Sequence, residues 1–366
     1  MSALVDRVNY QADYLDDYDT FFERIINKTC VPTQLELQPG REKGRALCWM
    51  DCPYCYGGKA TNDGVRLPIS RYLEILKEIS NGPHGNIKKV IIAGYATDPL
   101  NYEHIDKLLE STILFKNIFG IHTKLLKISE KFINLISGNE INKKSYITVS
   151  LDAGYNESYN ITHGIKSKAK VLSKIYNNIE AIMKKKSKNI DVGGTYLITK
   201  ANVSENEIKQ SIKDVNDLGI QTLRFSFPQT PRGYDLDAKE DIIFKERDEA
   251  KKMLKNLISN LKSDTKVSFV DPDEDYQIDK ERMLPCYARF VHPAIGFDGY
   301  LYHCSESSSP DFHDMSLGNL HKSSFWESYY SYDIDKLHED FKKMEKNKCM
   351  CDRKLFIVNK KFGNRL

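Results

Sequence analysis

Three cysteines lie close together near the start of the chain, Cys48, Cys52 and Cys55, in the pattern C-x3-C-x2-C, and the aromatic Tyr54 precedes the last of them. A structural zinc ion takes four protein ligands, so three thiolates on one short loop leave its shell incomplete. The same three thiolates can hold three irons of a cubane iron–sulfur cluster and leave the fourth iron open. Half of a zinc ribbon and three structural thiols are the alternatives, but Asp51 and the distant histidines are poor fourth ligands. The spacing therefore favours a cluster with one open iron, the position at which chemistry takes place.

A second set of cysteines lies far downstream. It has a C-x12-G-x4-C pattern around Gly299 and a closing C-x-C pair, formed by Cys286, Cys304, Cys349 and Cys351. Four thiolates suit a fully ligated iron–sulfur cluster, and they equally suit a structural zinc ion. Spacing alone does not separate these two. Cys30 belongs to neither set, and we expect it to be a buried, inert thiol.

The composition is that of a globular protein, with 366 residues, 40% hydrophobic and 29% charged residues, and a formal net charge of only +3. This length permits one large domain and a smaller one. The small net charge implies no strong attraction to nucleic acid or to a membrane surface. The chain has no apolar run of transmembrane length, and its amino end is acidic and aromatic, unlike a signal peptide. We therefore expect a cytoplasmic protein without nucleic-acid or membrane partners, in which clustered cysteines bind metal.

Apolar periodicity predicts six strands with helices between them. The strands are expected at 33–38, 88–93, 118–126, 145–151, 192–199 and 222–227, and a seventh is expected at 266–270. Apolar residues at helical spacing follow most of these strands, as at Ile69, Leu73 and Leu76. The alternation predicts an α/β fold built on a parallel sheet with crossover helices. From about residue 285 onward the alternation ends.

These patterns divide the chain into four parts. We expect a helical lead-in over 1–30, the α/β domain over 31–240, a connecting helix and strand over 241–280, and a small cysteine-containing domain over 281–366. Ligands of parallel α/β folds bind at the carboxyl ends of the strands. The loop with Cys48, Cys52 and Cys55 follows the first strand, so we expect it at that edge.

The cysteine loop, with Cys48, Cys52, Tyr54 and Cys55, resembles the signature of the radical S-adenosylmethionine (radical SAM) superfamily. The six strands and their helices are similar to the partial (β/α)6 barrel of that family. The resemblance implies a [4Fe–4S] cluster on the three cysteines, whose open iron binds S-adenosylmethionine (SAM). It also implies that an electron from a reductase such as flavodoxin or ferredoxin cleaves SAM, and that a 5′-deoxyadenosyl radical then abstracts a substrate hydrogen atom. The protein orients the cofactors and excludes water.

The resemblance also assigns residues that contact SAM. The Gly-Gly-Glu-Pro-like segment of the family corresponds to residues 94–100, where the paired glycines are not kept, and Asp98 is expected to receive the SAM amino group. Ser150 and Asp152 match the Ser-Leu-Asp ending of the fourth strand and are candidates for the ribose hydroxyls, and Arg224 is a candidate for the carboxylate. A turn, a cap or a side chain on the other face of a strand is the alternative for each. The full expected set is Gly94, Ala96, Thr97, Asp98, Ser150, Asp152, Arg224 and Tyr54, with His122, Thr123 and Lys124 as further residues that can face the cavity.

The downstream cysteines resemble the twitch domain, a shortened form of the SPASM domain found in many radical SAM enzymes. The resemblance implies one auxiliary [4Fe–4S] cluster on Cys286, Cys304, Cys349 and Cys351, although C-x2-C is commoner than C-x-C in the final pair. It implies a radical SAM oxidoreductase that oxidises or epimerises a small polar substrate such as a sugar or aminosugar derivative. A ribosomal-peptide or protein maturase of the SPASM type is the alternative. A non-catalytic iron–sulfur electron-transfer or scaffold protein is the alternative from another class.

Overall fold

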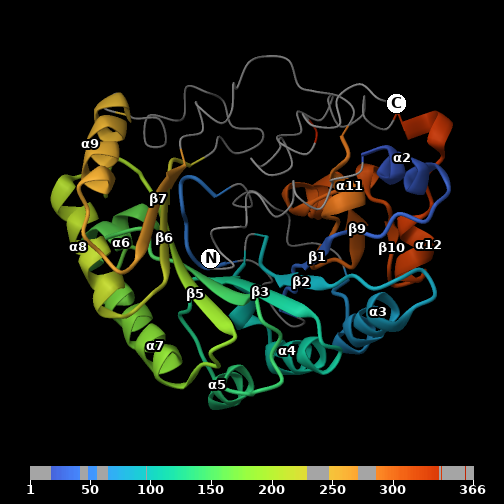
Figure 1. The fold of residues 1–366 in the computed structure, drawn as a ribbon, viewed down its shortest axis with the longest axis horizontal. Coiled ribbons are helices and arrows are strands. Elements are labelled where there is room, and N and C mark those ends of the chain that lie inside the picture. The colour runs from blue at the N-terminus through green and yellow to red at the C-terminus, as the bar shows by residue number, and fades with distance from the viewer. Residues whose placement is uncertain are drawn as a thin grey trace.

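The computed structural model describes residues 18–41, 48–55, 65–95, 97–228, 247–270, 286–337, 339 and 359. Within these ranges ten strands form one sheet in the order β10-β9-β8-β1-β2-β3-β4-β5-β6-β7. The sheet is curved and open, and helices lie along its outer side (Figure 1). None of the helices in these ranges is both long enough and apolar enough to span a membrane.

From β1 to β7 each strand of the described chain pairs in parallel with the next along the sequence. Their bounds are β1 Gln34–Leu37, β2 Lys89–Ile92, β3 Ile118–Thr123, β4 Ser145–Ser150, β5 Ile190–Leu197, β6 Thr222–Ser226 and β7 Lys266–Val270. The predicted α/β fold with a partial barrel is confirmed. β3 ends three residues earlier than the range predicted for it, because Leu125 adopts a φ of 55°, which strands do not accommodate.

Helices cover the outer side of the sheet and pack their apolar faces against it. They are α3 Ile69–Asn81, α4 Ile105–Leu114, α5 Glu130–Ile136, α7 Val171–Lys185, α8 Glu205–Asp217 and α9 Arg247–Ser259 (Figure 1). Each long helix buries an apolar stripe, as α7 does with Leu172, Ile175 and Ile179. Two shorter helices, α2 Tyr18–Ile26 and α6 Asn156–Thr162, complete this part of the chain, and the apolar pattern did not predict α6.

The two faces of the sheet differ in chemistry because successive side chains of a strand point to opposite faces. Toward the helices the strands bury apolar side chains such as Val90, Ile147 and Leu223. The intervening positions belong to the inner face and are largely polar, among them Glu36, Gln38, His122, Ser150, Thr195 and Arg224. The fold therefore offers a polar inner surface to a ligand.

The C-terminal segment adds three short strands to the same sheet. β8 Ala294–Ile295 pairs in parallel with β1, and β9 Tyr300–Tyr302 and β10 Gly318–Asn319 follow in antiparallel order. The short helices α11 Ala288–Val291 and α12 Phe325–Tyr329 flank these strands. Three 3-10 helices also belong to this segment: η3 Ser305–Ser307, η4 Pro310–Met315 and η5 Ile334–Lys336. A further one, η1 Pro99–Asn101, follows β2. The sequence did not predict these strands, because two or three residues are too few to display a period.

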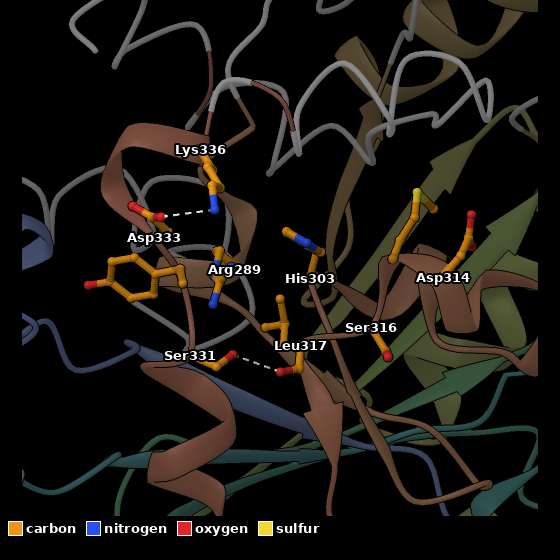
Figure 2. A pocket seen from close by; sticks show the side chains of 10 residues that line it. Arg289, His303, Asp314, Ser316, Leu317, Ser331, Asp333 and Lys336 are labelled. Atoms are coloured by element: carbon orange, nitrogen blue, oxygen red, sulfur yellow. Dashed lines mark hydrogen bonds and ion pairs between the residues drawn. The ribbon is translucent and has the colours of Figure 1, made fainter.

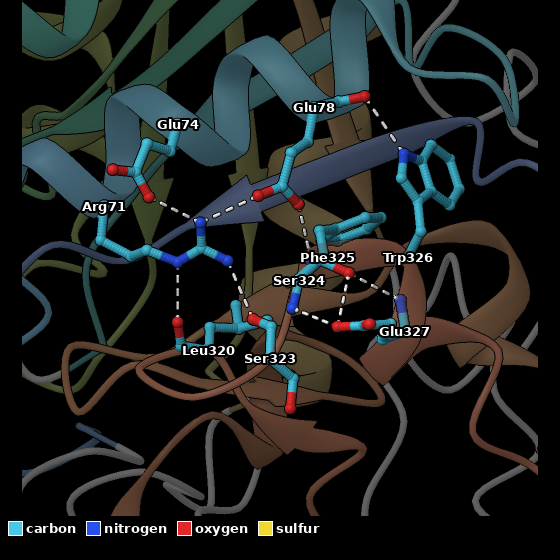
Figure 3. Close-up of polar contacts among 9 residues, drawn as sticks. All are labelled: Arg71, Glu74, Glu78, Leu320, Ser323, Ser324, Phe325, Trp326 and Glu327. Atoms are coloured by element: carbon cyan, nitrogen blue, oxygen red, sulfur yellow. Dashed lines mark hydrogen bonds and ion pairs between the residues drawn. The ribbon is translucent and has the colours of Figure 1, made fainter.

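Arg71 on α3 joins the C-terminal segment to the helical layer (Figure 3). Its Nε donates to the carbonyl of Leu320 at 2.8 Å, and its Nη2 donates to the carbonyl of Ser323 at 2.8 Å. Its Nη1 pairs with Glu78 at 2.8 Å, and Glu78 accepts a hydrogen bond from the backbone N–H of Phe325 at 2.7 Å, at the start of α12. Arg71 thus ties the turn after β10 to α3, and its partner Glu78 ties the first residue of α12 to the same helix.

Candidate functional site

The cysteine loop lies beyond the carboxyl end of β1, where the ends of the parallel strands meet. Cys48, Cys52 and Cys55 are all half-buried, so each thiol keeps some access to the space beyond the sheet. The backbone N–H of Cys55 donates to the carbonyl of Cys52 at 3.0 Å, and that of Met50 donates to Cys48 Sγ at 3.4 Å. Burial raises the pKa of Cys52 to about 11, and the ammonium of Lys124 opposes that rise. The loop is compact and carries three thiols at the edge where ligands bind.

The turn at the end of α6 holds this loop from behind. The backbone N–H of Asp51 donates to the carbonyl of His163 at 3.2 Å, and His163 Nδ1 lies 3.2 Å from Cys52 Sγ and 3.0 Å from the hydroxyl of Tyr54. Gly164 has a φ of 62°, and a Cβ there would lie 2.2 Å from the carbonyl oxygen of Asp51. Only glycine lets the two backbones approach this closely. Sequence reasoning missed His163, since no motif marks a lone histidine more than 100 residues from the loop.

Asp152, at the end of β4, connects the site to β5. It is buried and adopts a φ of 46°, a conformation that only a few residue types tolerate. Its Oδ1 accepts a hydrogen bond from the backbone N–H of Leu197 at 2.7 Å, and its carbonyl accepts one from Asn202 Nδ2 at 2.7 Å. Its Oδ2 lies 3.4 Å from His163 Nε2. The structure therefore places this predicted SAM-contacting residue behind the cysteine loop as well as at the strand edge.

Asp98 lies at the corresponding edge beyond β2. Its buried carboxylate accepts hydrogen bonds from the backbone N–H of Leu100 at 2.9 Å, from Thr123 Oγ1 at 2.9 Å and from the backbone N–H of Lys124 at 2.6 Å. Burial raises its pKa, and these hydrogen bonds oppose the rise. The carboxylate thus caps η1 and fixes the end of β3. Its predicted contact with the SAM amino group stays a prediction.

The turn before Asp98 is unusually tight. A Cβ on Gly94 would lie 2.0 Å from the carbonyl oxygen of Thr97, so the chain can turn here only because residue 94 is glycine. Both residues are half-buried. Ala96 lies outside the described residues. The predicted SAM segment is therefore a narrow turn at the ligand-binding edge.

Ser150 and Arg224 share the inner face of the sheet. Ser150 on β4 pairs with Thr195 on β5, and Thr195 pairs with Arg224 on β6. Since neighbouring strands lie about 4.8 Å apart, the backbones of Ser150 and Arg224 are about 10 Å apart. All three side chains are half-buried. The register thus places on one row two residues that the sequence proposed separately for the ribose and the carboxylate of SAM.

The C-terminal cysteines that the structure describes are buried, with relative exposures of 7% for Cys286 and 2% for Cys304. Cys349 and Cys351 lie outside the described residues. Cys30 is buried, and burial raises its pKa to about 12, as expected of an inert thiol. A cavity of about 270 Å³ also lies in this segment, with Arg289, His303 and Lys336 among the residues that line it (Figure 2).

The cysteine loop has the composition that an iron–sulfur cluster requires. Three thiols from one loop lie at the open edge of the sheet, with a lysine ammonium whose positive charge favours the thiolate form of Cys52. Within the described ranges, no three His, Cys, Asp or Glu side chains are grouped closely enough to hold one metal ion. The thiolates of a cubane bind separate irons, so they need not converge on one point. Cys48, Cys52 and Cys55 therefore fit a cluster with one open iron.

Comparisons with known proteins agree with this geometry. The sequence model of the radical SAM superfamily matches residues 46–215. The structure of Streptococcus suis SuiB bound to S-adenosylmethionine is similar, with 14% identity and a TM-score of 0.61 over 87% of this chain and 70% of that chain. The structure of histidine-tagged anSMEcpe with bound AdoMet is also similar, with 17% identity and a TM-score of 0.58 over 91% of this chain and 92% of that chain. No curated protein matches the sequence. At these identities the likeness concerns the fold, and it extends well beyond residues 46–215.

Proposed function

We propose that this chain, whose residues 46–215 match the sequence model of the radical SAM superfamily, is a radical SAM enzyme that binds SAM at the carboxyl edge of its sheet and abstracts a hydrogen atom from a polar substrate. A [4Fe–4S] cluster held by Cys48, Cys52 and Cys55 would supply the electron that converts SAM into methionine and a 5′-deoxyadenosyl radical. The observation that carries the proposal is the position of three half-buried thiols beside a polar inner face.

The residues around the loop would bind and orient SAM. The turn at Gly94 brings backbone carbonyls to the edge of the sheet, where they can accept hydrogen bonds from an ammonium group. Ser150 and Arg224 lie in one row of the inner face, at a spacing that suits the two ends of an extended ligand. Arg224 supplies a guanidinium for a carboxylate, and Ser150 supplies a hydroxyl for a ribose.

The polar inner face favours a small hydrophilic substrate, such as a sugar or aminosugar derivative, which the enzyme would oxidise or epimerise. An apolar substrate would displace water from the half-buried polar groups of this face without offering them hydrogen bonds, at a cost of about 1–3 kcal/mol for each group left without one. A reductase such as flavodoxin or ferredoxin would deliver the electrons. The likeness to SuiB bound to precursor peptide SuiA, at 14% identity and a TM-score of 0.61, supports a peptide substrate as the second candidate.

We further propose that Cys286 and Cys304, with Cys349 and Cys351, hold an auxiliary [4Fe–4S] cluster. The burial of Cys286 and Cys304 suits a fully ligated cluster, which needs no open position. Iron and sulfide analysis of the reconstituted protein tests this assignment. Two cubanes predict about eight irons and eight sulfides per chain, whereas about four irons and one zinc would contradict it.

Anaerobic reconstitution with iron and sulfide, followed by SAM and dithionite, tests the catalytic proposal. We expect 5′-deoxyadenosine and methionine in chromatograms of the reaction, and we expect none when dithionite or SAM is left out. A fully loaded protein that forms no 5′-deoxyadenosine would favour the remaining alternative, a non-catalytic iron–sulfur protein that transfers electrons or scaffolds a partner.

A further inference from the structure

His163 gathers side chains from three separate parts of the chain around one imidazole ring. Its Nδ1 lies 3.2 Å from Cys52 Sγ, 3.0 Å from the hydroxyl of Tyr54 and 3.2 Å from the ammonium nitrogen of Lys124. On the opposite side of the ring, Nε2 lies 3.4 Å from Asp152 Oδ2. The imidazole is completely buried. These contacts join the cysteine loop to the ends of β3 and β4.

The chemistry of the neighbours fixes the role of each ring nitrogen. Nδ1 has a single lone pair, so it accepts one proton at a time from the two donors beside it, the Lys124 ammonium and the Tyr54 hydroxyl. With Nδ1 as the acceptor, the ring proton lies on Nε2, which faces Asp152 Oδ2 at 3.4 Å without a well-formed hydrogen bond. Cys52 Sγ, the Tyr54 hydroxyl and the Lys124 ammonium all lie within 3.2 Å of this nitrogen, so any proton that is not given to Nδ1 can be donated to the Cys52 sulfur.

The backbone around His163 is held as firmly as its ring. The carbonyl of His163 accepts from the backbone N–H of Asp51 at 3.2 Å, and Gly164 meets the same residue so closely that it has no room for a Cβ. The ring of Tyr159 packs against the imidazole with centroids 4.2 Å apart. Neither the loop nor the ring can shift without breaking these contacts, so the position of Cys52 is coupled to that of His163.

We propose that His163 is a positioning residue that holds the Tyr54 hydroxyl and the Lys124 ammonium beside the Cys52 sulfur and thereby tunes the cluster on the cysteine loop. Donors and positive charge near a ligating sulfur stabilise the reduced, more negative cluster. The inference rests on the proposed function, because it requires a cluster on Cys48, Cys52 and Cys55. It adds a role for a residue to which the sequence analysis assigned none.

The test compares His163→Ala and His163→Asn with the wild type in the full-length reconstituted protein. Asparagine can place an amide oxygen near the position of Nδ1, so it can still accept from Tyr54 and Lys124, whereas alanine cannot. We expect His163→Ala to lower the midpoint potential of the cluster, to alter its electron paramagnetic resonance spectrum, and to reduce 5′-deoxyadenosine formation about 10-fold. We expect His163→Asn to recover most of each property.

Two further variants keep the test decisive. Tyr54→Phe removes one donor and leaves the ring in place, so it should shift the potential in the same direction by a smaller amount, even if His163→Ala fails to fold. His84→Ala replaces an exposed histidine that packs on Trp326 and Tyr330, far from the loop, and should leave potential and spectrum unchanged. The inference would be overturned if both His163→Ala and Tyr54→Phe kept the midpoint potential and the spectrum of the wild type. A wild type that forms no 5′-deoxyadenosine would instead overturn the proposed function.

Discussion

The two cysteine-bearing regions of this chain differ in how the fold presents their thiols. Cys48, Cys52 and Cys55 are half-buried on a loop at the open edge of the sheet, and His163 at the end of α6 lies beside this loop together with Lys124, just beyond β3. Cys286 and Cys304 are buried inside the segment that extends the sheet beyond β1. An accessible set suits a cluster that must bind a second molecule, and a buried set suits one that transfers electrons or holds the fold together.

The largest expected effect separates the two regions directly. Cys52→Ala should abolish SAM cleavage, because the cluster with the open iron loses a ligand. Cys304→Ala should remove about half of the iron while part of the SAM cleavage survives. Iron content and 5′-deoxyadenosine yield, measured on the same reconstituted samples, report both outcomes. Equal losses of iron and of 5′-deoxyadenosine yield in the two variants would mean that the two regions do not have the different roles that their burial suggests.

The reactivity of Cys30 reports the burial of a single thiol. Cys30 packs against the C-terminal segment and belongs to neither cysteine set. Its Sγ lies 3.8 Å from the carbonyl of Phe290. Because burial raises its pKa from 9.0 to about 12, its thiolate fraction at pH 8 is about a thousandfold smaller than in an unfolded chain. Alkylation with iodoacetamide should therefore be about a thousandfold slower in the native protein, as followed by mass spectrometry. Similar rates before and after unfolding would contradict the burial of this thiol.

A comparison of two glycines tests whether the turn at Gly164 matters specifically for the cysteine loop that it contacts. Gly164 and Gly219 have φ values of 62° and 70°, but a Cβ on Gly219 would meet only Met183 Cε at 3.7 Å. Gly219→Ala should therefore lower the free energy of unfolding by the cost of a left-handed residue, about 1–2 kcal/mol. Gly164→Ala adds a clash with Asp51 and should lower it by about 3 kcal/mol.

Urea unfolding measures both glycine variants, and iron content distinguishes them further. Only Gly164→Ala should reduce the iron bound by the cysteine loop, because only this turn contacts the loop. A normal iron content in Gly164→Ala would show that the loop forms its site without that contact.

The smallest expected effect concerns the attachment of the second region. Arg71→Ala leaves the carbonyls of Leu320 and Ser323 and the half-buried Glu78 without their donor, and should lower the free energy of unfolding by about 1–2 kcal/mol. Arg41→Ala removes a more exposed pair with Glu103, at 3.2 Å, and should cost less than about 1 kcal/mol. Urea unfolding of both variants checks the difference, and equal costs would argue against the junction at Arg71.

The sequence by itself determined the parallel sheet, the positions of its main strands along the chain and the cysteine loop at its edge. Alternation and helical spacing are local patterns, so the strands around Ile91, Ile147 and Phe225 were predictable without any knowledge of tertiary contacts. The C-x3-C-x2-C spacing was equally local, and the residues 46–215 that match the superfamily contain it.

Only the tertiary structure decided what surrounds that loop. His163 reaches Cys52 because α6, a short helix with a weak apolar pattern, ends beside a loop more than 100 residues earlier. Ser150 and Arg224 share a row because of the register of two strand pairs, which the sequence of each strand does not specify. The strands β8 to β10 are too short to carry a period and form only because β1 offers them an edge. Long-range packing and hydrogen bonding fix such contacts, and local sequence patterns do not contain that information.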